Sequence, residues 1–438
     1  MKKLDPEKKQ RLINLQEERE SRALKRKNTK KKKKPTIHQN VIKDSNLLNY
    51  LVKHNFQYKT KYKGPIHSIK IPKDFSFITN QNETLRTIAH LVTAINDPSI
   101  EHLNIDHSEC LKLDLGASAV MDVIILEATK TWKSLENPPV VDGFYSIDAK
   151  VNEIIKVSGI IKNLKHKDAE VAPEVLKKYE LFTLQEGSKS QNLSAFQSTQ
   201  AELIATKLTD YVDKILGKVD FMLTLAGKKN FIHMVSEVLD NAEQHSHTST
   251  WYVSGYLNEK KICNIAIFNF GETISETLSS AKLNWQLKNN IQELIKTHSK
   301  KGFFKFGYTW SAENLWTLYA LQEGISRFNI EGRKIHRGQG TVRLIEFFLD
   351  LASKNNIEVP PRMVLISGNT FILFDGKYSL KDMSVAGELR QVIAFNEANS
   401  LEDRPDQNNI KKLKFSFPGT IITMRFCIEG EYLKQHFS

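Results

Sequence analysis

The stretch from Phe231 to Gly271 constrains the fold of this chain more than any other part. It reads FIHMVSEVLDNAEQHS and then, after a polar break, KICNIAIFNFGETI. In the first half apolar residues recur at helical spacing, and Glu237, Asn241 and His245 fall four residues apart along one face. The second half has the pattern of a strand, over 262–268. The stretch therefore predicts an amphipathic helix followed by a strand.

The polar residues on that helix suit phosphate chemistry. Magnesium binds a few protein oxygens and completes its shell with water and phosphate oxygens, and the amide oxygen of Asn241 fits that role. A carboxylate one turn earlier, at Glu237, can orient or deprotonate a hydroxyl or a water for attack on phosphorus. Asn241 is the predicted Mg²⁺ ligand and Glu237 the predicted catalytic residue.

These residues resemble the first motif of the GHKL nucleotide-binding fold, shared by DNA gyrase, MutL, histidine kinases and anti-sigma kinases. That motif has a Glu, three residues, an Asn and an Ala, often followed by a His or Tyr, which His245 matches here. The resemblance implies ATP as ligand or substrate. It also implies a C-terminal two-layer α/β sandwich with a mixed, mostly antiparallel sheet, in an α/β (α+β) chain.

The second family motif is a strand that ends in Asp-x-Gly, whose Asp accepts a hydrogen bond from the adenine amino group. This chain has Asn269, Phe270 and Gly271 at that place. An amide oxygen can accept the same hydrogen bond, but without the assistance of charge, so base recognition is expected to be weaker or altered. The alternative interpretation of these residues is an ordinary β-turn.

The third motif is glycine-rich and opens a helix, because free N–H groups at a helix start attract phosphate. Gly338, Gly340 and Thr341 match it, in RGQGTVRLIEFFLDLASKNN, and the alternative is a plain loop before a core helix. Arg337 or Arg343 can add positive charge there. A predicted hairpin (MVLISGNTFILFDGKYS) follows, and then Gly419 and Thr420 begin a closing strand, as in the family. The implied ATP-binding residues are Asn241, His245, Asn269, Gly271, Gly338, Gly340, Thr341 and Thr420.

A segment of 66 residues separates Gly271 from Gly338, and in the GHKL fold this segment is the lid over the nucleotide. It is long for a loop and contains two helical patterns, so a lid over 272–337 is expected. Lys300, Lys301 and Lys305 are candidate contacts to the γ-phosphate.

The region 67–186 alternates strand-like and helix-like patterns, which is typical of a small α/β domain. It resembles the STAS fold of anti-sigma antagonists, most closely at Asp114-Leu115-Gly116-Ala117-Ser118 before a helix. The phospho-acceptor Ser of that family is absent from the matching position. A packing domain without chemistry is the favoured interpretation, and a docking role stays open.

The positive charge is concentrated at the N-terminus. Residues 1–36 contain fifteen Lys and Arg against five Asp and Glu, a net of +10 out of +13 for the chain. This tail, above all 25–34, is expected to be disordered or marginally helical, and to bind nucleic acid or an acidic partner, or simply to aid solubility. No apolar run approaches the length of a membrane helix, and no secretory signal is recognisable. Cys110, Cys263 and Cys427 are expected to be buried free thiols in a cytoplasmic protein.

The expected organisation is a tail (1–36), a connector (37–66), the STAS-like domain (67–186), a linker (187–196) and the ATP-binding domain (197–430). The leading hypothesis is a bacterial regulatory or defence protein with slow Mg-ATPase activity, in which lid closure controls contact with a protein partner. Two alternatives stay open: an anti-sigma-type serine/threonine kinase, and a non-catalytic nucleic-acid or assembly module with a relic pocket. A homodimer also stays open.

Overall fold

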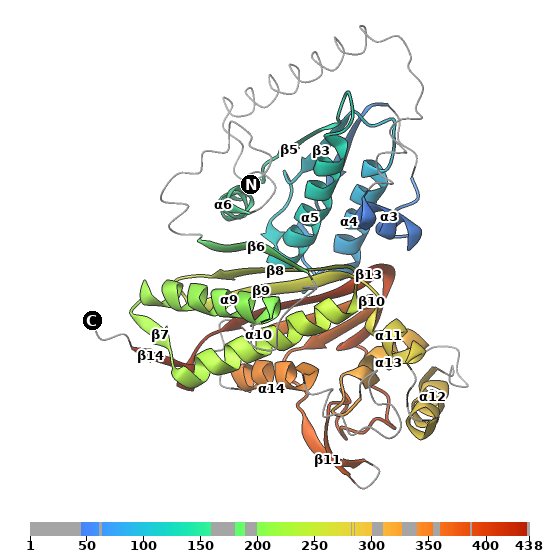
Figure 1. Ribbon diagram of the computed structural model, residues 1–438, viewed down its shortest axis with the longest axis vertical. Coiled ribbons are helices and arrows are strands. Elements are labelled where there is room, and N and C mark those ends of the chain that lie inside the picture. Colours follow the sequence, from blue (N-terminus) through green and yellow to red (C-terminus); the bar gives the residue numbers. More distant parts are fainter. Residues whose placement is uncertain are drawn as a thin grey trace.

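The computed structural model describes residues 45–60, 64–158, 180–188, 199–281, 283, 285–299, 310–325, 340–353, 360–385 and 388–435. The fold is mixed α/β, as the sequence predicts (Figure 1). Within these residues no helix combines the length and the apolar character needed to cross a membrane. The three cysteines are buried and free, which confirms that prediction.

The first part of the fold follows the predicted alternation of strands and helices. Three parallel strands form a sheet in the order β1-β3-β5, and two long helices, α4 and α5, connect them. A short parallel pair, β2 and β4, lies beside it. The elements are α3 (Asn46–Lys53), β1 (Ile66–Lys70), β2 (Asp74–Phe75), α4 (Gln81–Ile95), β3 (His102–Asp106), β4 (Lys112–Leu113), α5 (Leu115–Trp132), β5 (Val140–Phe144) and α6 (Ala149–Val157).

The second part is built on a five-stranded sheet in the order β10-β13-β9-β8-β6, in which every pairing is antiparallel. Its edge strand, β6, was expected in the STAS-like domain but pairs with β8 instead. The elements are β6 (Leu181–Ser188), α9 (Gln200–Gly217), β7 (Phe221–Leu223), α10 (Leu225–His245), β8 (Ser246–Leu257), β9 (Ile262–Gly271), α11 (Ile274–Ser280), α12 (Trp285–Ser299), α13 (Ala312–Ala320), α14 (Gly340–Ser353), β10 (Arg362–Phe374), β11 (Lys381–Val385), β12 (Glu388–Val392), β13 (Ile410–Cys427), η1 (Gly430–Tyr432) and β14 (Leu433–Gln435).

Helices cover both faces of this large sheet. Figure 1 shows α9, α10 and α14 on one face and α4 and α5 on the other. The alternation along β9 explains the arrangement, because successive side chains point to opposite faces. Ile265 and Ile267 join the core cluster of α10, whereas Phe268 and Phe270 join that of α5. The sheet therefore lies between two helical layers, one of which the N-terminal part supplies.

The start of α5 packs closely against the large sheet. A Cβ on Gly116 would lie 3.1 Å from the Thr423 hydroxyl oxygen of β13, so only glycine allows this approach without a shift. Asp114 caps the helix by accepting the Gly116 N–H at 2.8 Å, and it also accepts the Phe77 N–H at 2.9 Å. Burial raises the pKa of Asp114. The turn that resembles the STAS phospho-acceptor loop is thus enclosed at an internal interface, and Ser118 is buried.

The described residues of the segment expected to form a lid include helices that pack into the fold. The described residues form α11, α12 and α13, and Leu315 and Leu318 of α13 are buried in the main core. The amide of Gln322 bonds both to the Ile393 carbonyl at 3.1 Å and to the Ile393 N–H at 2.9 Å. The region 310–325 is therefore a fixed part of the fold, which packs on the chain between β10 and β13.

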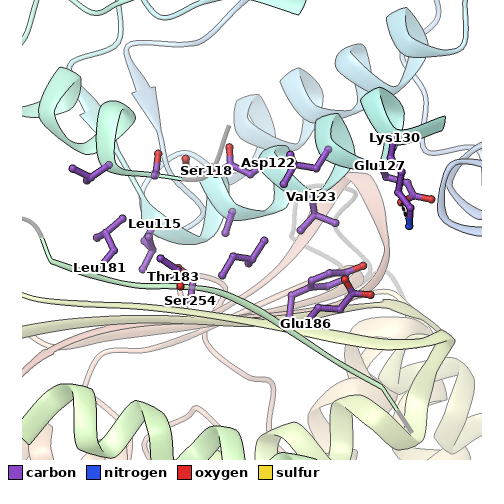
Figure 2. Close-up of a pocket in the computed structure, with 16 residues that line it drawn as sticks. Leu115, Ser118, Asp122, Val123, Glu127, Lys130, Leu181, Thr183, Glu186 and Ser254 are labelled. Atoms are coloured by element: carbon purple, nitrogen blue, oxygen red, sulfur yellow. Dashed lines mark ion pairs between the residues drawn. The ribbon is translucent and has the colours of Figure 1, made fainter. Parts of the chain in front are cut away.

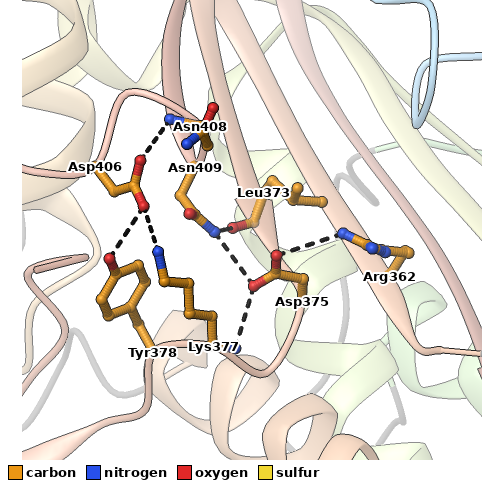
Figure 3. Close-up of polar contacts among 8 residues, drawn as sticks. All are labelled: Arg362, Leu373, Asp375, Lys377, Tyr378, Asp406, Asn408 and Asn409. Carbon is orange, nitrogen blue, oxygen red and sulfur yellow. Dashed lines mark hydrogen bonds and ion pairs between the residues drawn. The ribbon is translucent and has the colours of Figure 1, made fainter. Parts of the chain in front are cut away.

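The chain reverses direction within β10, as the predicted hairpin over 363–379 requires. Gly368 adopts φ +59°, and the register against β13 shifts on both sides of it. The turn lies there, because Arg362 and Asp375 are in contact although a straight strand between them would be about 40 Å long. Beyond the end of this strand, Asp375 bonds to Arg362 at 3.4 Å and to the Asn409 amide at 3.3 Å (Figure 3). These contacts join the two ends of β10 to each other and hold the residue before β13 beside them.

Candidate functional site

The helix α10 forms as predicted, with one face in the core and one open. Val235 and Leu239 are fully buried, while the side chain of Glu237 is 33% exposed. Asn241 lies one turn further along and is half-buried. The helix therefore presents a carboxylate and an amide side by side at the edge of the core, where both can reach a ligand.

Acidic residues make this part of α10 attractive to cations. Burial, together with the neighbouring Glu237 and Glu243, raises the pKa of Asp240 to about 6. A bound cation relieves such repulsion between carboxylates. Among the described residues there is no group of three or more His, Cys, Asp and Glu side chains arranged to hold a metal.

Asn269 lies inside β9, so the β-turn alternative for Asn269-Phe270-Gly271 is wrong. Its side chain is 1% exposed and points to the face that α10 covers, because its neighbours Phe268 and Phe270 point to the other face. Its amide nitrogen has no hydrogen-bond partner among the described residues. A buried donor without a partner costs about 1–3 kcal/mol, so this atom indicates a place where a ligand can bind.

Two hydroxyl groups continue from Asn269 across the sheet. Thr420 of β13 is the direct cross-strand partner of Asn269, and Ser367 of β10 is the partner of Thr420. The two hydroxyl oxygens are 3.0 Å apart, and Ser367 also accepts the N–H of Ile274 at 2.9 Å. We call Asn269, Thr420 and Ser367 the amide–hydroxyl row. Each member can donate and accept hydrogen bonds, and none carries a charge.

Gly419 allows β13 to pass close to Asn269. It adopts φ +148°, and a Cβ there would lie 2.1 Å from the Asn269 carbonyl oxygen. Any other residue would push the two strands apart and separate Asn269 from Thr420. The Gly-Thr pair at 419–420 thus has a physical role in the sheet itself.

The helix α14 packs against α10 and runs antiparallel to it. Phe347 contacts Phe231 with ring centroids 6.1 Å apart, and Arg343 lies 3.9 Å from Glu237 and hydrogen-bonds to His233. Lower residue numbers in α14 lie beside higher residue numbers in α10. The start of α14 at Gly340 therefore lies toward the end of α10 that carries Asn241. The free N–H groups of the first turn, with Thr341, are thereby directed to that end.

Several predicted site residues cannot be placed. Gly338, Arg337, Lys300, Lys301 and Lys305 lie outside the described residues, and His245 ends α10 without a described side chain. Gly271 ends β9, opposite Ser246. The sequence reasoning missed Ser367, because a serine within an apolar strand carries no motif. Its only signal is the polar SGN sequence inside an otherwise apolar stretch.

Comparisons of this chain with protein-family models, with curated proteins and with solved structures found no match.

Proposed function

We propose that this chain binds Mg-ATP between α10, α14 and the amide–hydroxyl row, and that it hydrolyses ATP slowly. The observation that carries the proposal is the buried amide of Asn269, which has a nitrogen without a partner among the described residues. It lies on the face of β9 that α10 covers, and that helix carries Glu237 and Asn241. A ligand that joins these groups needs a polar ring at one end and charged oxygens at the other.

The amide–hydroxyl row suits a purine base. An Asn side chain can donate to a ring nitrogen and accept from an exocyclic amino group at the same time, which matches one edge of adenine. The first contact gives the orphaned nitrogen of Asn269 its missing partner. Thr420 and Ser367 can orient the amide or hold a bridging water.

The phosphates belong at the other end, between α10 and the start of α14. The N–H groups from Gly340 onward can cradle phosphate oxygens. Asn241 fits a magnesium ion, which when bound neutralises phosphate charge and fixes the geometry of the phosphates. Glu237 orients the attacking water by accepting its proton in a hydrogen bond.

The segment after β9 links this site to the rest of the molecule. Ile274, the first residue of α11, donates its N–H to Ser367 of the row, and Thr273 caps α11. A ligand that reorders the row therefore acts directly on the start of the segment expected to form the lid. We propose that this movement controls contact with a protein partner.

A thermal-shift titration with ATP and Mg²⁺ tests binding. A ligand at about 100 times its dissociation constant stabilises a protein by about 2.7 kcal/mol. The expected result is a rise in the unfolding midpoint that requires both ATP and Mg²⁺. An unchanged midpoint at millimolar ATP contradicts the proposal and favours the relic pocket.

Phosphate release separates the ATPase from the kinase. Because the Ser118 hydroxyl is buried, the acceptor hydroxyl of a kinase has to come from elsewhere. With γ-labelled ATP, label in free phosphate supports the ATPase. Label on a Ser or Thr of an added partner protein supports the kinase.

A further inference from the structure

A cavity of about 460 Å³ lies between α5 and the edge of the large sheet, on the far side from the proposed nucleotide site (Figure 2). The helix α5 forms one wall, and β6 and β8 form the other. Its volume is in the range of pockets that bind ligands, and such pockets often lie between packed units. Binding and hydrolysis of ATP at the proposed site give this cavity no role.

Carboxylates dominate the charge of this cavity. Asp122 and Glu127 extend from α5, and Glu186 extends from β6 on the opposite wall. Among the described lining residues, Lys130 is the one cation. Asp122 is only 4% exposed, and the Lys130 side chain is 80% exposed with its ammonium 4.0 Å from Glu127. The rest of the lining combines apolar side chains with hydroxyl groups. The apolar residues are Leu115, Ala119, Val123, Leu126, Val157, Leu181 and Leu184, and the hydroxyl groups belong to Ser118, Ser158, Thr183, Tyr252 and Ser254. The cavity thus suits a cation on an apolar stem.

The N-terminal tail enters the described structure at the rim of this cavity. Ser45 is the first described residue, and its hydroxyl donates to Glu127 at 2.7 Å. Upstream of it, segment 25–34 holds eight Lys and Arg and no acidic residue. We propose that this lysine-rich segment docks in the cavity, with lysine ammonium groups at Glu127 and Glu186.

The length of the chain and its chemistry both fit this occupant. The stretch from Lys34 to Ser45 can span at most about 40 Å, so the segment can fold back to the cavity from its own attachment point. Lysine buries its methylene stem against apolar surface and leaves the ammonium at a polar rim. Exposed ion pairs are individually weak, but a short tether holds the segment at an effective concentration of order millimolar.

Zero-length carbodiimide cross-linking of the full chain, followed by mass spectrometry, tests the docking. This reagent joins a lysine amine to a carboxylate only when the two are in contact. Links from 25–34 to Glu127 and Glu186 are expected, and their yield should fall as salt rises from about 0.05 to about 0.5 M, since salt screens exposed charges. Links from these glutamates only to lysines of 159–179, or none to 25–34, overturn the proposal.

A variant separates docking from random encounter. Glu127→Gln leaves Glu186 as an acceptor, so the link from 25–34 to Glu186 should fall about two- to fivefold if both carboxylates hold the segment. Glu136→Gln, at an exposed position beyond α5, is the matched control and should leave that link unchanged. Equal yields in both variants, with unchanged unfolding midpoints, overturn the proposal, as does an equally strong link to Glu136 in the unaltered chain.

Discussion

Asn269 and Thr420 lie directly opposite each other on β9 and β13, although 150 residues separate them in the chain. Gly419 makes their approach feasible, since a side chain there would strike the Asn269 carbonyl. The pair extends to Ser367, and so a polar row crosses an otherwise apolar sheet face close to the C-terminal end of β9. The two hydroxyls of the row are hydrogen-bonded to each other, but the Asn269 amide nitrogen has no partner among the described residues, and such a buried group costs stability unless a ligand binds it.

Replacing Asn269 with Ala should weaken ATP binding about tenfold or more while leaving the unliganded protein about as stable as before. The reason is that the buried nitrogen has no partner to lose. Asn314→Ala is the matched control. Asn314 is 0% exposed, and its amide bonds to Thr370 at 3.0 Å and to the Ser311 N–H at 2.9 Å. That change should destabilise the fold by about 1–3 kcal/mol and spare ATP affinity. Calorimetry and urea unfolding measure the two effects, and the reverse pattern would contradict the ligand role of Asn269.

Replacing Glu237 with Ala should abolish phosphate release while ATP binding persists. The carboxylate is needed only to orient the attacking water, so its loss is expected to cost about 10²-fold or more in rate. Asn241→Ala should instead remove the Mg²⁺ dependence of ATP binding, and Glu346→Ala, at an exposed position on α14, should change neither. Phosphate release and thermal shifts with and without Mg²⁺ measure these outcomes. An equal loss of binding and hydrolysis in the Glu237 variant would remove its assigned role.

Replacing Gly116 with Val should destabilise the whole protein by about 1–3 kcal/mol or more, because the branched side chain meets Thr423 and Ala266 where α5 touches the sheet. Gly217→Ala is the control, since a Cβ there has nothing within 4 Å. It should be neutral or slightly stabilising. Chemical unfolding followed by fluorescence tests this prediction. If Gly116→Val left stability unchanged, the close packing of α5 on β9 and β13 would be wrong.

Stability should depend on pH through the histidine pair His67 and His90, whose Nε2 atoms lie 3.2 Å apart. Burial, with His67 and Arg86 nearby, lowers the pKa of His90 to about 4, and burial lowers the pKa of His67 despite the opposing effect of Asp97. A lowered pKa means that the unfolded chain binds the proton more readily. Stability from this pair is therefore complete above about pH 6.5 and is lost as the pH falls toward 4.

The variant His90→Gln should reduce the change in the free energy of unfolding between pH 7 and pH 4 by about 1–2 kcal/mol. This magnitude takes the partial exposure of the ring into account. The comparison has to be made with the unaltered chain, because burial also lowers the pKa of His107 to about 4 in the same window. Asp240, with its pKa raised to about 6, acts in the opposite direction. Urea unfolding from pH 4 to pH 7 provides the measurement. If the free energy of unfolding changed equally with pH in the two proteins, the histidine pair would make no contribution to the pH dependence of stability.

The sequence by itself determined the local elements of this protein. Helical spacing specified α10 and α14, and apolar strand patterns specified β9 and β13, because neighbours in the chain impose these periods. The order of motifs also singled out Asn269 and Thr420 before any contact between them was known.

Only the tertiary structure decided which surfaces meet. An alternating or apolar strand pattern does not state its partner, so β6 was expected beside the parallel sheet but joins β8. In the same way, the sequence of β9 does not indicate that α5 packs on Phe268 and Phe270. It also does not indicate that Ser367 lies next to Thr420 in the amide–hydroxyl row. The pairing of elements depends on the total apolar area that all of them bury together. The physical reason is that hydrophobic burial is non-directional and acts at any separation along the chain, so a local pattern does not specify the partner.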